Sequence, residues 1–156
     1  MFKNSSEIFA YIKKEDVKLI DVRFTDLPGI QHHFNVPVES FDEAVFTDGL
    51  MFDGSSIRGF QSIHESDMKL LPVPESAFID PFRVEKTLVI IFSVHNPGDN
   101  SPYSRDPRGV VAKAVDYLKS TGIADQAFFA PEAEFYVFDA VRFSTGMNES
   151  YHHIDS

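Results

Sequence analysis

Residues 17–36 read VKLIDVRFTDLPGIQHHFNV and carry the clearest strand pattern in the chain. Apolar side chains recur at every second position, which is the period of a strand with one buried face. They are Ile20, Val22 and Phe24 in the first half and Ile30, Phe34 and Val36 in the second. Between the halves, residues 27–30 (LPGI) place Pro28 second and Gly29 third in a type II turn. The stretch therefore predicts an antiparallel hairpin.

The segments on either side of the hairpin add a helix and a central strand. Asn4, followed three residues later by Glu7, is typical of a capped helix start. Residues 86–94 contain the run 88–92, which is apolar on both faces and predicts a fully buried strand. Residues 41–71 show no clear period, so we expect a long loop there, of the kind that is usually functional.

The chain changes character at residues 96–102, whose composition NPGDNSP is typical of a linker, and we place a domain boundary there. A helix is predicted next, with Asp106 as its N-cap and Pro107 as its first residue. Its apolar stripe is expected to be buried and consists of Val111, Ala114, Val115 and Leu118. Residues 127–143 are predicted to form one strand, or two strands joined by a bend. The fold class is therefore α+β.

Composition excludes several classes of function. With 24 acidic and 14 basic residues, the net charge of −10 argues against nucleic acid or an anionic membrane as partner. The absence of cysteine excludes disulfides, thiolate metal sites and a cysteine nucleophile, and it is compatible with a reducing compartment. The longest apolar run is too short to span a bilayer. We therefore expect a soluble, cytoplasmic protein.

Two glutamates form the sharpest local feature, within the segment PEAEFY at residues 131–136. In a strand, residues two apart face the same way, so Glu132 and Glu134 would project side by side. Their mutual repulsion is tolerable if one is protonated, if the site is wet, or if a cation lies between them. Spacing alone leaves two interpretations open, a solvated strand face and a cation site.

A second candidate site is the loop FDGSSIRGF at residues 52–60. The pair Asp53 and Gly54 is a turn signal, and Ser55 and Ser56 offer hydroxyls and free backbone amides. Such a loop could hold a phosphate or an ammonium ion, although the same residue types are typical of any tight turn. It lacks the spacing of a phosphate-binding P-loop.

Five segments, taken together, closely resemble the N-terminal part of prokaryotic type I glutamine synthetase. They are DLPG at 26–29, FDGSSIRGF at 52–60, DPFR at 80–83, SRDPR at 104–108 and PEAEFY at 131–136. Their order and spacing match across essentially the whole chain, which corresponds to about the first third of that family's chain. The resemblance implies a β-grasp domain at residues 15–98, followed at 105–156 by the first helix and strand of a truncated α/β catalytic domain.

The resemblance also implies an activity and roles for particular residues. The family uses ATP to phosphorylate the γ-carboxylate of glutamate, and ammonia then displaces phosphate to give glutamine. Two divalent metal ions, Mg²⁺ or Mn²⁺, sit in each site. At the matching positions, Glu134 would ligate the metal nearer glutamate and Glu132 the metal nearer the ATP phosphates. Asp53 would take the ammonium ion and help to deprotonate it, with Ser56 beside it.

The family's subunits form a homo-oligomer of two stacked rings, with each active site shared between neighbouring subunits. The resemblance therefore implies that Asp53 and Ser56 act on the adjacent subunit's site. We expect the 156-residue chain alone to be inactive. Two alternatives stay open: a related γ-glutamylamine ligase that uses another amine, and a non-catalytic β-grasp module that assembles with or regulates a synthetase.

Overall fold

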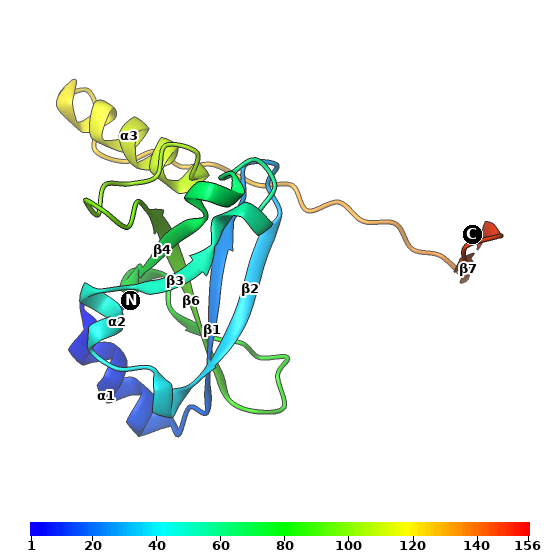
Figure 1. Ribbon diagram of the computed structural model, residues 1–156, viewed down its shortest axis with the longest axis horizontal. Helices are drawn as coiled ribbons and strands as arrows, with labels where there is room; N and C mark the ends of the chain where they lie inside the picture. Colours follow the sequence, from blue (N-terminus) through cyan, green and yellow to red (C-terminus); the bar gives the residue numbers. More distant parts are fainter. The chain divides into compact units, whose positions relative to one another are not determined.

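The computed structural model describes all 156 residues and divides the chain into two compact units, Met1–Gln126 and Ala127–Ser156 (Figure 1). None of the helices is both long enough and apolar enough to cross a membrane.

The first unit is built around one mixed sheet in the order β2-β1-β6-β4-β3, with β5 also paired to β6. Its strands are β1 (Leu19–Thr25), β2 (Gln31–Pro37), β3 (Leu50–Asp53), β4 (Asp67–Pro72), β5 (Phe78–Ile79) and β6 (Thr87–His95). β1 and β6 run parallel, and every other pair is antiparallel. The predicted hairpin and the predicted central strand are both confirmed, and the sheet is the arrangement expected of a β-grasp domain.

The core lies between this sheet and the N-terminal helix α1 (Ser5–Glu15). Asn4 caps α1 as predicted, since its side chain accepts a hydrogen bond from the backbone N–H of Glu7 at 3.0 Å. Ile8 and Ile12 are the buried residues of α1. They pack with the alternating apolar residues of the strands, among them Ile20, Val22, Met68, Leu70, Leu88 and Ile90. Burial of this alternating face fixes which side of each strand points inward.

The hairpin turn differs from the prediction by one residue. The N–H of Gly29 donates to the carbonyl of Asp26 at 3.1 Å, so the closing hydrogen bond spans residues 26–29 and not 27–30. Gly29 is the last residue of this turn and has a φ of +96°, a conformation that favours glycine. The side chain of Asp26 accounts for the shift, because it accepts the N–H of Ile30 at 2.7 Å and completes the turn from its own first position.

The prediction of a long loop at residues 41–71 is wrong. The segment contains the short helix α2 (Ala44–Thr47), the strands β3 and β4, and two 3₁₀ turns, η2 (Gly54–Ser56) and η3 (Ile63–Glu65). Further 3₁₀ turns lie at η1 (Val38–Ser40) and η4 (Pro74–Ser76). The strand signal was weak because β4 buries only Met68 and Leu70, which is too short an alternation to stand out in sequence.

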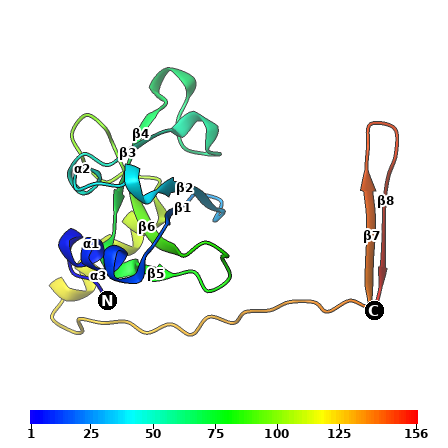
Figure 2. The ribbon, with the colours of Figure 1, turned by 90° about the horizontal axis from the view of Figure 1, so that it is seen from below.

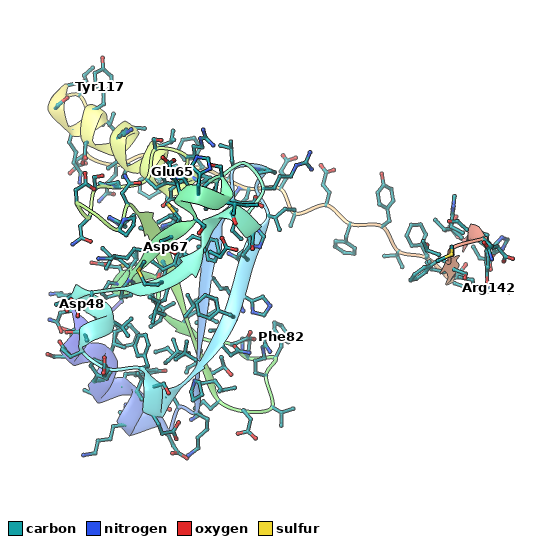
Figure 3. The ribbon with its side chains drawn as sticks, in the orientation of Figure 1. Asp48, Glu65, Asp67, Phe82, Tyr117 and Arg142 are labelled. Atoms are coloured by element: carbon teal, nitrogen blue, oxygen red, sulfur yellow. The ribbon has the colours of Figure 1, made fainter.

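The helix α3 (Pro107–Ser120) begins as predicted, with Asp106 accepting a hydrogen bond from the N–H of Arg108 at 2.9 Å. The prediction that its apolar stripe is buried is wrong. Val111 is 62% exposed and no residue of α3 is fully buried, because no element of the first unit covers that side of the helix. Figure 3 shows Tyr117 projecting from α3 into open space.

The second unit contains a hairpin, β7 (Ala140–Thr145) paired antiparallel with β8 (Ser150–Asp155) (Figure 2). The predicted strand at residues 127–143 is correct only from Ala140 onward, since residues 127–138 form neither helix nor strand. The apolar pattern of that segment favours a strand, but a strand needs a hydrogen-bonded neighbour, and no other segment of the chain pairs with it.

Candidate functional site

The loop that follows β3 presents Asp53 at its start. The Oδ1 atom of Asp53 accepts the backbone N–H of Ser55 at 2.9 Å and the hydroxyl of the same serine at 2.6 Å. The Oδ2 atom accepts the hydroxyl of Ser56 at 2.6 Å. Asp53 and Ser56 are both exposed, so this network fixes the orientation of a carboxylate that faces solvent. The structure thus brings the two predicted residues of this loop together.

The same contacts stabilise the negative charge of Asp53. Hydrogen bonds from Ser55, followed by those from Ser56, hold the pKa of the Asp53 carboxyl below its usual value of 3.8. Hydrogen bonds to a carboxylate favour its charged form. Asp53 is therefore an anion throughout the neutral range. Both serine hydroxyls donate to it, so their oxygens keep only lone pairs to offer to a ligand.

Gly54 allows the loop to lie close to β4. Its N–H donates to the carbonyl of Ser66 at 2.6 Å, and a Cβ at this position would lie 2.4 Å from Cγ of Met68 and 3.1 Å from that carbonyl oxygen. Met68 is fully buried, so its side chain has little room to move away.

We expect Gly54→Ala to lower the free energy of unfolding of the chain by about 1–3 kcal/mol, the usual cost of forcing atoms into a packed core. Urea unfolding followed by circular dichroism measures it. Gly98→Ala is the matched control, because a Cβ there would meet nothing within 4 Å; we expect a change within about 0.5 kcal/mol. Equal free energies of unfolding for Gly54→Ala and Gly98→Ala would contradict the close approach of the loop to β4.

Aromatic side chains of the β1–β2 hairpin pack against the residue that precedes Asp53. The ring of Phe52, one residue before Asp53, lies 4.9 Å from the ring of Phe24, which stacks on His32 at 5.4 Å. Nε2 of His32 is 2.8 Å from Oδ2 of Asp26. Burial raises the pKa of Asp26, but the hydrogen bonds from His32 and from the backbone of Ile30 outweigh it and leave that pKa below its usual value.

Tyr103 and Arg105 contact the C-terminal end of the loop, at residues 59–60. Sequence reasoning did not assign either residue to a site. The hydroxyl of Tyr103 donates to the carbonyl of Phe60 at 2.8 Å, and Nη1 of Arg105 donates to the carbonyls of Gly59 at 2.8 Å and Phe60 at 2.6 Å. Arg105 belongs to the SRDPR segment quoted above, whereas Tyr103 carried no sequence signal. Contacts to backbone carbonyls leave no residue pattern that a sequence could show.

The two glutamates lie in the second unit. Glu132 and Glu134 are both exposed and belong to the segment without helix or strand, so the side-by-side arrangement on a strand face is not seen in this structure. Nowhere in the chain do three or more histidine, aspartate or glutamate side chains gather closely enough to hold a metal ion. Carboxylate oxygens are nevertheless the ligand type that Mg²⁺ and Mn²⁺ prefer.

Comparison with known proteins identifies the fold as that of glutamine synthetase domains. The family model described as the glutamine synthetase β-grasp domain matches residues 16–97, and the one described as the catalytic domain matches residues 104–156. The first match alone spans more than half of the chain. The chain belongs to the glutamine synthetase family.

Individual relatives agree with this assignment. The glutamine synthetase of Frankia alni is 59% identical over 156 residues, which is 100% of this chain and 33% of that protein. The glutamine synthetase of Mycolicibacterium smegmatis is 59% identical over 154 residues, 99% of this chain and 32% of that protein. A cryo-EM structure of Plasmodium falciparum glutamine synthetase has a TM-score of 0.81 and 23% identity, covering 99% of this chain and 30% of that chain, and it shows the shared fold alone. The chain spans about a third of the length of the curated relatives it matches.

Proposed function

We propose that this chain is the N-terminal third of an ATP-dependent glutamate–ammonia ligase, which forms glutamine through γ-glutamyl phosphate. The observation that carries the proposal is identity of 59% along the entire chain to a protein named glutamine synthetase. Within the chain, we propose a β-grasp domain at residues 15–98 and the start of the catalytic domain at 105–156. The absence of cysteine suits the reducing cytoplasm, where we place the enzyme.

The chemistry of the Asp53 loop supports ammonium, and not phosphate, as its ligand. Asp53 is an anion, and the hydroxyl hydrogens of Ser55 and Ser56 are already directed at it. The side chains of Asp53, Ser55 and Ser56 therefore offer a ligand only acceptors, which suit the N–H groups of a cation and repel a phosphate. In the proposed reaction Asp53 binds ammonium, Ser56 helps to orient it, and the carboxylate favours loss of the proton that frees ammonia for attack.

Glu132 and Glu134 are the proposed metal ligands of this chain. Their hard oxygen donors fit Mg²⁺ or Mn²⁺, with Glu134 assigned to the ion nearer glutamate and Glu132 to the ion nearer the ATP phosphates. When bound, such ions neutralise charge on a transferring phosphoryl group. One carboxylate for each ion is too few for a stable site, so the remaining ligands must come from outside residues 1–156.

We further propose that the full-length enzyme is a homo-oligomer whose active sites are shared between subunits. In this arrangement Asp53 and Ser56 of one subunit serve the site that holds the glutamates of its neighbour. The support is the match of the segments at residues 52–60 and 131–136 to a family whose active sites are shared between neighbouring subunits.

The test compares the full-length protein with the 156-residue chain. With glutamate, ATP and Mg²⁺, we expect the full-length protein to form glutamine from ammonium in preference to methylamine or a polyamine. We expect the 156-residue chain to form none and to bind Mn²⁺ with a dissociation constant of roughly millimolar or weaker in titration calorimetry, because it supplies one ligand for each ion.

Each contrary result has a distinct meaning. Preference of the full-length protein for a larger amine would favour the γ-glutamylamine ligase, and no turnover with any amine would favour a non-catalytic module. Micromolar Mn²⁺ affinity of the 156-residue chain would show that it supplies more ligands than the two glutamates.

A further inference from the structure

The segment between β6 and α3 reaches back to the end of the Asp53 loop. Tyr103 is buried, its hydroxyl donates to the carbonyl of Phe60 at 2.8 Å, and its ring meets the Phe60 ring edge-on with centroids 5.2 Å apart. Arg105 donates from Nη1 to the same carbonyl and to that of Gly59. Two consecutive carbonyls of the loop therefore find their partners outside the loop, and one of them has two donors.

These donors are themselves fixed to the central strand. The N–H of Tyr103 donates to the carbonyl of Val94 at 2.9 Å, and Oδ2 of the buried Asp106 accepts the N–H of Val94 at 2.8 Å. The N–H of Asp106 donates in turn to the carbonyl of Tyr103 at 3.1 Å. The segment that carries Tyr103 and Arg105 is thus hydrogen-bonded to Val94 of β6 at Tyr103 and at Asp106.

The far end of the loop is connected to Asp53 by its own backbone. The N–H of Gln61 donates to the carbonyl of Gly54 at 3.3 Å, and the N–H of Ile57 donates to the same carbonyl at 3.2 Å. Gly54 directly follows Asp53. Displacing Phe60 would therefore pull on Gln61, open the contact to Gly54, and disturb the turn that orients the carboxylate of Asp53.

We propose that Tyr103 and Arg105 are positioning residues that hold the Asp53 loop in its ammonium-binding conformation. The functional part of this inference rests on the proposed ligase activity. When a binding-competent conformation is only fractionally populated, the apparent dissociation constant rises by the inverse of that fraction. Loss of these contacts therefore weakens ammonium binding selectively, because this loop is proposed to bind ammonium, whereas the metal ligands proposed to lie near glutamate and ATP are Glu134 and Glu132.

The test uses the full-length protein with Tyr103→Phe, Arg105→Gln, the double variant, and the conservative Arg105→Lys. Tyr103→Phe keeps the ring packing on Phe60 and removes only the hydroxyl. The matched controls are Tyr11→Phe on α1 and Arg58→Gln, an exposed arginine of the same loop. Hydrogen exchange of the amides of Gly54, Ile57, Phe60 and Gln61 reports the loop, and steady-state kinetics reports each substrate separately.

In the double variant we expect those amides to exchange roughly tenfold faster and the KM for ammonium to rise roughly tenfold, the factor that losing one or two net hydrogen bonds gives. The KM values for glutamate and ATP should stay within about twofold. Each single variant should show less, because the Phe60 carbonyl keeps one donor, and Arg105→Lys should recover part of the loss.

Unchanged exchange in the double variant would overturn the proposal, as would parallel rises in all three KM values, which a merely structural role predicts. Hydrogen exchange tests the positioning role of Tyr103 and Arg105, and enzymatic activity tests the proposed ligase function. If the unmodified protein forms no glutamine, the proposed ligase function fails. The exchange measurement alone then decides whether Tyr103 and Arg105 hold the loop.

Discussion

Asp53→Asn in the full-length enzyme should lower the rate of glutamine formation from ammonium by about a hundredfold to ten-thousandfold, the usual cost of losing a general base. Asparagine keeps the shape of the side chain and can still accept the N–H of Ser55, so the turn should persist. What it loses is the negative charge that, in the proposed role, favours bound ammonium and receives its proton. Coupled measurement of glutamine and of phosphate release gives the rate.

Activity with a neutral amine distinguishes an ammonium-specific role of Asp53 from a general effect on activity. Hydroxylamine is largely uncharged at neutral pH and needs no anion to bind or deprotonate it, so γ-glutamyl hydroxamate formation by Asp53→Asn should fall far less than glutamine formation. Asp99→Asn is the matched control, because Asp99 makes the same turn contacts with the N–H and hydroxyl of Ser101. Equal losses with ammonium and hydroxylamine would reject an ammonium-specific role for Asp53.

Glu134→Gln should strongly slow the phosphorylation of glutamate, the step that precedes attack by ammonia. A neutral amide is a weak ligand for a hard divalent ion, and losing charge neutralisation at a transferring phosphoryl group costs several kcal/mol, or roughly a thousandfold in rate. Both glutamine and hydroxamate formation should therefore fall together, unlike in Asp53→Asn. Progress curves at increasing Mg²⁺ check the cause, since a metal ligand's loss is partly offset by high metal concentration.

Glu149→Gln is the control for this variant, because Glu149 is an exposed glutamate in the turn between β7 and β8. Its activity should match that of the unmodified enzyme. If Glu134→Gln retained hydroxamate formation at ordinary Mg²⁺ concentrations, Glu134 would not be a metal ligand.

The parts of the fold that sequence predicted are those with strong local signals. The alternation around Ile20 and Val22 predicted β1 and its partner β2, the doubly apolar run at 88–92 predicted the centre of β6, and Asn4 predicted the start of α1. In each case the pattern repeats over several residues or uses a cap with one dominant geometry. Such signals do not depend on distant parts of the chain.

The elements that the sequence did not predict are those whose structure depends on contacts with other parts of the chain. β4 carries only two buried side chains, and the turn at Asp26 was set by a side chain that accepts a backbone N–H. The strand expected at residues 127–138 and the burial expected for α3 both require neighbouring elements that this chain does not pair with them. Asp53 and Ser56 were predicted from a turn signal and a resemblance, and the structure shows their hydrogen bond. Tyr103 contacts a backbone carbonyl and carried no residue pattern.

In the proposed assembly, Asp53 of one subunit serves the site that holds its neighbour's Glu134. Subunits carrying Asp53→Asn and subunits carrying Glu134→Gln, each expected to have roughly 1% or less of the unmodified activity (about a hundredfold loss or more), are co-expressed with different tags. Assemblies that contain both are purified and verified by native mass spectrometry. With equal and random mixing, half of the sites have an intact Glu134 and half of those receive an intact Asp53, so we expect about one quarter of the unmodified activity. Activity no greater than that of the parent variants, in assemblies of confirmed mixed composition, would contradict the shared site.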